Sequence, residues 1–266
     1  MKAFNLFLDP HPDSFPQTFP DDAPDVGWVG TDGPAVAPEQ WPRSPLSGLP
    51  MLHGFTLLLP QDYRTQGPEY VAISFFQGDG EFVSEDTMSK ASASSDDPYL
   101  RQLAEYSPHP MLQERVDILD QPFAFIWLTQ AEYDGGPTAP PTDVRRPGEH
   151  RQEESPSAWD TPVQDGRIRM TERTGDPNVG HAPNEDGEGD YQDPWADSAN
   201  KQHGWADALW EVKHVGHLGG TSFPVQAMPE NLSPYYLEFD EFGGLNFGTG
   251  AAQLDLKTDT FDWACG

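Results

Sequence analysis

The sequence predicts an α+β domain that is dominated by mixed or antiparallel β-sheet and has few helices. Three observations predict it: short runs of β-branched and aromatic residues bounded by proline and glycine, one clear helix start, and a long polar stretch between two apolar regions. We expect a single domain over residues 1–266. Two similar halves, 1–128 and 204–266, are expected to be separated by a long polar insertion or linker at 129–203.

The first half is expected to hold two pairs of strands. Residues 9–50 are rich in proline, glycine and aspartate, which indicates an irregular arm over the surface. The runs 55–59 and 70–76 predict two buried strands that are neighbours in one sheet, because the link between them is short. A second pair of strands is expected at 116–120 and 123–128.

A helix is expected between these two pairs of strands. Asp97 can accept hydrogen bonds from the unpaired N–H groups of a first turn, and Pro98 suits the first helical position. Leu100 and Leu103 follow at helical spacing, and Pro108 ends the pattern.

The middle of the chain has a different composition. Residues 129–203 are much poorer in apolar residues than the chain as a whole, so we expect them to contribute little to the core, with at most a small hairpin around Asp165 and Gly166. The core composition returns at Trp205. The runs 235–239 and 251–256 predict two further strands.

The charge of the chain limits the kinds of partner it can bind. It has 15 basic and 44 acidic residues and a formal net charge of −29. Such a surface repels phosphates and anionic lipids, so we expect no direct binding to nucleic acid or to membranes. A basic protein is the expected class of partner. The alternative is that the acidity only keeps the protein soluble.

Other composition signals indicate a simple intracellular protein. No apolar run approaches the ~20 residues that cross a bilayer, and the apolar residues before Asp9 are too few for a signal peptide. We therefore expect a cytoplasmic location. Cys265 is the single cysteine, so no intramolecular disulfide can form. We expect a monomer without a cofactor.

Several uncommon features follow one another in the last fifty residues. They are His217-x-Gly219-Gly220-x-x-x-Pro224-x-Gln226, a strand that ends in Asp240, the corner Gly248-Thr249-Gly250, and Trp263-x-Cys265. This order resembles the YwqG-like family, a bacterial domain of unknown biochemical function. The first half, with Trp41-Pro42 and Phe75-Phe76, is similar to the first half of such domains. The matching stretches cover about half of the chain.

The chain departs from the family pattern in two places. One is the polar stretch 129–203. The other is the corner at Gly248 and Gly250, where the family's usual Gly-Asp-x-Gly is shorter and lacks the acid. A ligand contact that the family makes through that acid would therefore be missing here.

The motif residues are interpreted as structural or binding residues. We expect His217 to bond a nearby backbone carbonyl at a tight turn, and Gly219 and Gly220 to need positive φ angles or a close backbone approach. Phe261 and Trp263 are two residues apart, so an extended tail would dock both onto the sheet. Pro224, Gln226, Gly248 and Gly250 complete the motif.

A metal site is weighed as an alternative. His214 and His217 share one face only if the segment is helical, and Gly216 argues against a helix. His203 or Glu211 could supply a third ligand. The acidic stretch 184–193 lacks the register of a calcium-binding EF-hand.

The preferred function is therefore non-enzymatic protein binding. The chain has no P-loop, nucleophile elbow or dinucleotide-binding turn, so no catalytic residue is assigned. The YwqG-like resemblance implies an immunity-type protein that neutralises a basic toxin. The alternatives are a metal-dependent or hydrolytic enzyme that uses His214, His217 and acidic residues, and a structural or housekeeping protein.

Overall fold

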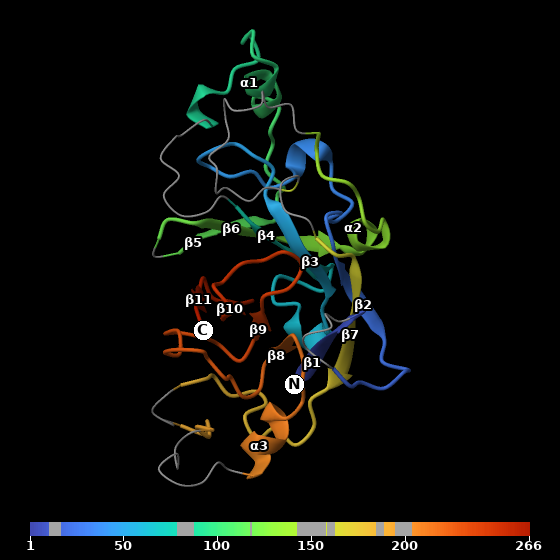
Figure 1. Cartoon of the computed structure of the whole chain (residues 1–266), viewed down its shortest axis with the longest axis vertical. Coiled ribbons are helices and arrows are strands. Elements are labelled where there is room, and N and C mark those ends of the chain that lie inside the picture. The colour runs from blue at the N-terminus through green and yellow to red at the C-terminus, as the bar shows by residue number, and fades with distance from the viewer. Residues whose placement is uncertain are drawn as a thin grey trace.

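Eleven antiparallel strands form one sheet in the computed structural model (Figure 1). The structure describes residues 1–10, 17–78, 88–117, 119–142, 158, 163–184, 189–194 and 204–266. The order of strands across the sheet is β11-β10-β9-β8-β1-β7-β2-β3-β4-β6-β5. Their bounds are β1 Phe4–Asp9, β2 Asp25–Val29, β3 Leu52–Leu58, β4 Tyr70–Gln77, β5 Leu112–Val116, β6 Pro122–Thr129, β7 Gly166–Glu172, β8 Gly216–Leu218, β9 Tyr236–Asp240, β10 Ala251–Asp255 and β11 Phe261–Ala264.

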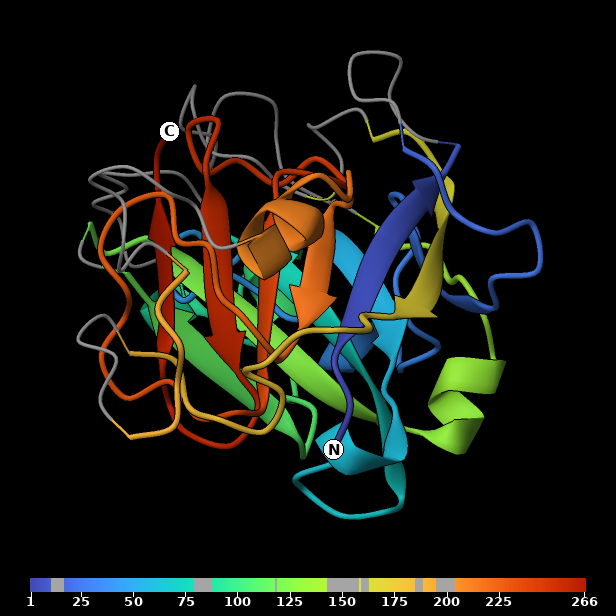
Figure 2. The same cartoon turned by 90° about the horizontal axis from the view of Figure 1, so that it is seen from below.

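The sheet curls until its two ends nearly meet. Phe261 of β11 packs on Phe123 of β6 with ring centroids 4.8 Å apart, and Phe239 of β9 packs on Phe55 of β3 at 5.2 Å. Arg115 of β5 pairs with an aspartate beyond β10. The main core therefore lies between the two curled parts of one nearly closed sheet (Figure 2).

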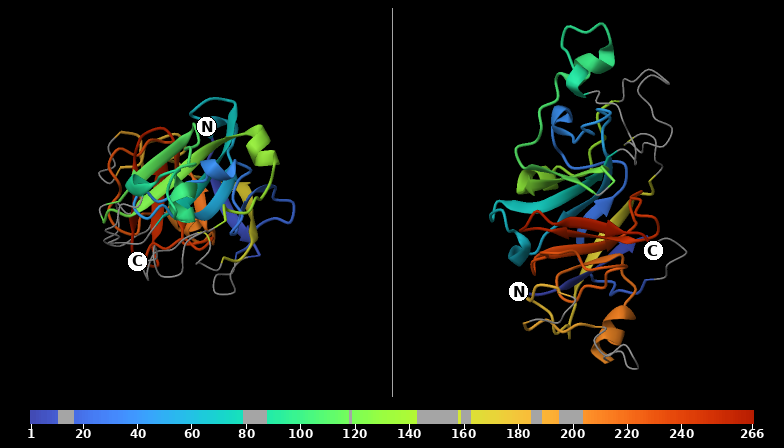
Figure 3. Two further views of the ribbon diagram at one scale, coloured as in Figure 1. Left: turned by 90° about the horizontal axis from the view of Figure 1, so that it is seen from above. Right: turned by 90° about the vertical axis from the view of Figure 1, so that its left-hand side faces the viewer.

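Few helices accompany this sheet in the described residues. They are α1 Pro98–Leu103, α2 Gln130–Asp134 and α3 Gly204–Trp210, with short 3-10 turns at Pro38–Gln40, Gln61–Tyr63 and Met88–Lys90. Helices α1 and α3 lie at opposite ends of the molecule, with the sheet between them (Figures 1 and 3). None of the helices described here has both the length and the apolar character that crossing a bilayer requires.

Most of the predicted strands are confirmed. The runs at 55–59 and 70–76 are β3 and β4, which pair with each other. Both are buried on two sides. In β4, Ile73 and Phe75 face the main core, while Ala72 and Phe76 face a second cluster with Trp41.

Three of the remaining strand predictions are confirmed and one is wrong. The runs at 123–128, 235–239 and 251–256 are confirmed as β6, β9 and β10. The strand expected at 116–120 is wrong, because β5 ends at Val116. Asp117 ends it: its carboxylate accepts the N–H groups of Leu119 and Gln121 and closes a turn in front of β6.

Helix α1 is confirmed where the capping pattern placed it. The Asp97 side chain accepts the N–H of Tyr99 at 2.9 Å, and Pro98 occupies the first turn. Tyr99 and Leu103 are buried on the face toward Leu49. This small cluster fixes the helix at one end of the molecule.

Two expectations about irregular segments are wrong. The arm at 9–50 contains β2, and the stretch at 129–203 contains β7. Strand β7 lies between β1 and β2 near the centre of the sheet, and Ile168 and Met170 enter the main core. A strand needs an apolar residue only at every second position, so the low apolar content of the stretch did not reveal it. The hairpin expected around Asp165 and Gly166 is instead the start of β7.

Candidate functional site

The polar residues of the C-terminal motif lie in a row across the sheet. The strand register places Asn5 of β1 opposite His217 of β8, His217 opposite Glu238 of β9, and Glu238 opposite Gln253 of β10. Side chains alternate along each strand, so the neighbours Leu237 and Phe239 of β9 face the main core. The polar row therefore occupies the other face of the sheet, where α3 and the segment after β8 cover it.

His217 makes the bond that its turn predicted. Its Nδ1 lies 3.0 Å from the carbonyl oxygen of Gly219, and its Nε2 lies 3.1 Å from Oε1 of Glu238. A carbonyl oxygen only accepts, and so does an ionised carboxylate, so both ring nitrogens face acceptors. Burial lowers the pKa of His217, which disfavours a second proton on its ring.

Glu238 is buried and its oxygens are occupied. It accepts hydrogen bonds from the Ser222 hydroxyl, from the Phe223 N–H at 3.0 Å and from Gln253 Nε2 at 3.2 Å, besides the contact with His217. Burial alone would raise the pKa of Glu238, but His217 and the other donors outweigh it and lower this pKa to about 2. The carboxylate thus links β9 to three segments: β8, the chain at Ser222 and Phe223, and β10.

This arrangement is not a nucleophilic site. Ser222 donates to Glu238, and both ring nitrogens of His217 contact Gly219 and Glu238 rather than the Ser222 hydroxyl. The His217–Glu238 pair is therefore suited to fixing the fold rather than to proton transfer with a substrate.

A second charged pair lies beside the first. Arg173, directly after β7, has its Nε 3.4 Å from Oδ2 of Asp176, and both side chains are fully buried. Asp176 also accepts the N–H of Thr221 at 2.8 Å, the Thr221 hydroxyl at 2.7 Å and the N–H of Asn178 at 2.9 Å. The sequence reasoning missed these residues, because nothing in a polar stretch distinguishes a buried arginine from a solvated one.

Arg173 has few partners for its five N–H donors. Its guanidinium lies over the ring of Phe223 at 5.5 Å, and within the described part of the chain its nitrogens make no hydrogen bond. The carboxylate of Asp176 offsets its charge. Arg173 connects the polar row to Phe223, which also packs edge-on against Trp210 of α3 at 5.4 Å.

The glycines of the motif behave as expected. Gly219 and Gly220 have φ angles of +58° and +81°, which confirms the positive φ prediction. A Cβ on Gly219 would lie 2.3 Å from the hydroxyl of Tyr63, and one on Gly220 would lie 2.3 Å from Asp176. The turn therefore needs glycine at both positions.

The other motif residues gather around the last strand. A Cβ on Gly250 would lie 1.6 Å from the carbonyl oxygen of Ala264, and Gly248 has a φ of +62°. Gln226 donates to the carbonyl of Cys265 at 2.9 Å. The structure thus divides the predicted residues into two groups. The first, here called the His217 turn, is His217, Gly219 and Gly220, and the second is Gln226, Gly248, Gly250 and Trp263 in or beside the last strand. Pro224 lies between the two groups in sequence.

The docking of the tail is confirmed in part. Phe261 packs on Phe123, and Trp263 packs on Phe247 at 6.0 Å and donates to Asp117 at 2.7 Å. Trp263 is only partly buried. Cys265 is exposed.

The two histidines that were considered as metal ligands, His214 and His217, lie side by side. The rings of His214 and His217 lie 5.6 Å apart. Across the described residues, no three His, Cys, Asp or Glu side chains are arranged to hold a metal ion. The proposed third ligand His203 and residues 185–188 of the acidic stretch lie outside the described residues.

A hollow of about 210 Å³, here called the Trp210 hollow, opens over the polar row. Its lining includes Trp210, His214, Phe223, Val225 and Asp240. Burial and the neighbouring His217 and Arg173 lower the pKa of His214 to about 3, so its imidazole is neutral at pH 7.

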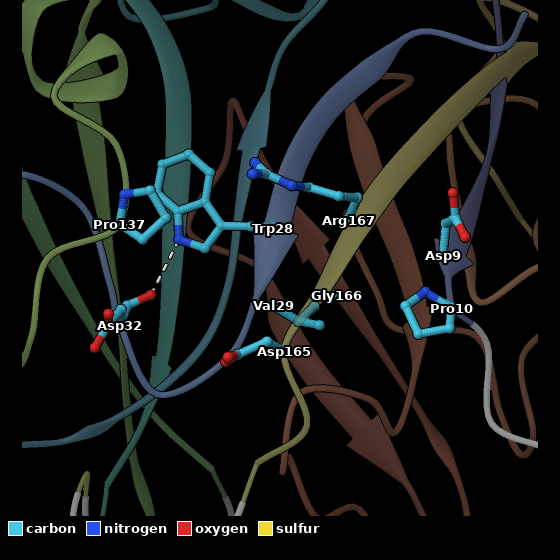
Figure 4. A pocket seen from close by; sticks show the side chains of 10 residues that line it. Asp9, Pro10, Trp28, Val29, Asp32, Pro137, Asp165, Gly166 and Arg167 are labelled. Atoms are coloured by element: carbon cyan, nitrogen blue, oxygen red, sulfur yellow. Dashed lines mark hydrogen bonds between the residues drawn. The ribbon is translucent and has the colours of Figure 1, made fainter.

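A larger hollow of about 360 Å³, here called the Trp28 hollow, lies where β2 ends and β7 begins (Figure 4). The Trp28 indole donates to the carbonyl of Asp32 at 3.0 Å, and Arg167 points toward the indole. Asp165 projects from the start of β7, and Asp9 is held by Arg169 at 3.1 Å. Sequence reasoning singled out none of these residues for function.

Compared with models of known protein families, with curated proteins and with solved structures, the chain matches none of them. The YwqG-like resemblance therefore stays a prediction.

Proposed function

We propose that this chain is a non-enzymatic binding protein that recognises a basic protein. The proposal rests on the position of the excess acidic residues, which lie outside the described core. Folding buries two arginines, Arg43 and Arg173, and three carboxylates, Asp176, Glu238 and Asp255, among the described residues. The buried charges nearly cancel, so the described core hides almost none of the acidic excess of the residues that the structure describes.

The buried polar groups support binding rather than chemistry. His217 and Glu238 bond each other and the backbone around them. A catalytic acid or base must reach a proton on the substrate, and the hydrogen-bonding positions of these two groups are taken by partners within the protein. An acidic surface, in contrast, attracts a basic partner over about 10 Å at 0.1 M salt and raises the rate of encounter.

The toxin-neutralising role is the form of this proposal that the YwqG-like resemblance implies. The protein would act in the cytoplasm as a monomer and would cover the active site of a basic toxin. It would bind neither nucleic acid nor membranes, because its charge repels both.

The test is capture followed by stoichiometric inhibition. The tagged protein is used to capture partners from the source cell at low salt, and the captured protein is identified and purified. We expect one basic protein at a ratio of one to one, whose activity falls to background at one equivalent. Inhibition at far less than one equivalent would indicate turnover and hence an enzyme. Capture of neutral or acidic proteins alone would overturn the proposal.

A further inference from the structure

The Trp210 hollow has apolar walls that stay open to solvent. Trp210 is 49% exposed and Val225 is 43% exposed, although both line the hollow. Phe223 forms the opposite wall and holds Trp210 edge-on. Large apolar side chains at the rim of a concave site are typical of ligand contacts, and an indole face also attracts cations.

The floor of the hollow carries negative charge. Glu238 and Asp240 are two residues apart on β9, so both point to this face of the sheet. Glu238 is already paired with His217. In the described structure, no side chain donates a hydrogen bond to Asp240 or forms an ion pair with it, although Lys213 also lines the hollow.

The surroundings of Asp240 disfavour its charge. The carboxyl is at the exposed rim, yet the surrounding protein and the nearby Glu238 and Glu241 raise its pKa to about 7. A cation placed in the hollow would relieve this repulsion.

The other charged groups around the hollow leave room for a cation. His214 is neutral, Arg173 lies against Phe223 with its charge offset by Asp176, and Lys213 is exposed and can extend into solvent.

We propose that the Trp210 hollow receives an arginine side chain of the basic partner. The guanidinium would bind the Asp240 carboxylate with two N–H donors and lie on the indole of Trp210, and its methylene stem would contact Val225. Arginine fits better than lysine, because its planar group pairs with a carboxylate through two bonds and stacks on an aromatic ring. This inference rests on the proposed function, since it identifies where the basic partner is recognised.

The direct test uses a single-side-chain probe. Nα-acetyl-L-arginine methylamide is titrated into the protein, and the indole N–H resonance of Trp210, assigned with Trp210→Phe, is followed by NMR. Nα-acetyl-L-citrulline methylamide, which has nearly the same shape and no charge, is the control ligand. We expect a saturable shift with the arginine probe and none with citrulline. Equal binding of both probes would overturn the inference, and so would no binding of the arginine probe.

Variants separate the hollow from the general acidity. Asp240→Asn should weaken binding of the arginine probe at least tenfold. Glu211→Gln removes the same charge from an exposed position near the end of α3 that does not line the hollow, and it should change binding less than twofold. Equal losses in the two variants would mean that only the overall charge matters.

The pH dependence gives a second readout. Binding should strengthen between pH 6 and 8, as Asp240 loses its proton, and this dependence should disappear in Asp240→Asn. Retention of the same pH profile in the variant would assign the titration to another group.

The outcomes also distinguish this inference from the proposed function. If the captured partner binds Asp240→Asn and Trp210→Phe as tightly as the unchanged protein, the hollow is not its contact site, while acidic binding stands. If the arginine probe binds the hollow but no basic protein is captured, the proposed function fails and the cation site remains.

Discussion

Gly219 shows how one residue fixes the turn that holds His217. Its φ is +58°, and a Cβ would lie 2.3 Å from the Tyr63 hydroxyl. That hydroxyl cannot easily move, because it is hydrogen-bonded to the carbonyls of Lys2 at 2.7 Å and Leu218 at 3.1 Å. Backbone strain and a steric clash therefore act together at this position.

We expect Gly219→Ala to lower the free energy of unfolding by about 2 kcal/mol or more. Gly136→Ala is the matched control, because Gly136 has a φ of +74° but no atom within 4 Å of the place that a Cβ would take. The control should lose only the backbone contribution, about 1 kcal/mol. Urea unfolding of both variants measures the difference. Equal losses would show that Tyr63 can move aside.

His53 makes the stability of the protein depend on pH. It is completely buried between the carbonyl of Gly30 at 3.0 Å and the hydroxyl of Thr56 at 2.9 Å. Burial lowers its pKa from 6.5 to about 4. Between these two values the unfolded chain binds a proton that the folded protein does not, so stability is lost as the pH falls.

We expect the free energy of unfolding to fall between pH 6.5 and 4 with a contribution from His53 of up to about 1.4 kcal/mol per pH unit. His214 acts in the same direction and Asp240 in the opposite one, so the slope must be compared with that of His53→Gln. Urea unfolding at several pH values gives both slopes. Identical slopes would mean that His53 is charged in the folded protein.

At the level of elements, the sequence predicts strands well where both faces are apolar. Strands β4 and β6 contain nearly continuous apolar runs, because one side packs in the main core and the other in a second cluster. In β7 apolar residues alternate with polar ones, and β1 has only a short apolar run. These two strands pair although they are far apart in sequence. Local composition carries no signal for such distant pairing.

The candidate site could be predicted only in part for a similar reason. The bond from His217 to Gly219 is local, so the glycine turn predicted it. The contact with Glu238 depends on the register of β8 and β9, and the position of Arg173 depends on where β7 enters the sheet. Those contacts needed the three-dimensional structure.

Strand β7 leads to a prediction opposite to the one that composition favours. Replacing residues 138–200 by a short Gly/Ser linker should abolish cooperative unfolding, because it removes the strand between β1 and β2 and the Arg173–Asp176 pair. Ile168→Asn should lower stability by about 3 kcal/mol, whereas Arg167→Asn, exposed on the same strand, should change it by less than about 0.5 kcal/mol. Thermal melts would show this, and a cooperative melt of the linker variant would contradict the sheet order.

At the level of the whole molecule, the buried polar groups and the acidic surface have different roles. The buried pairs and their hydrogen bonds connect the end of β7, the turn after His217 and β9. Burying these charges costs desolvation free energy that offsets most of their attraction. We therefore expect the pairs to fix one arrangement of these segments rather than to add much stability. Among the described residues the buried charges nearly cancel, so the acidic excess of these residues lies outside the core.

The most direct test of this account is the salt dependence of association with the captured basic partner. Rate constants are measured by surface plasmon resonance between roughly 20 mM and 500 mM salt, a range over which the screening length falls severalfold. If the acidic surface recognises the partner, the association rate constant will fall at least tenfold and the dissociation rate constant will change much less. An association rate constant that does not depend on salt would contradict the account.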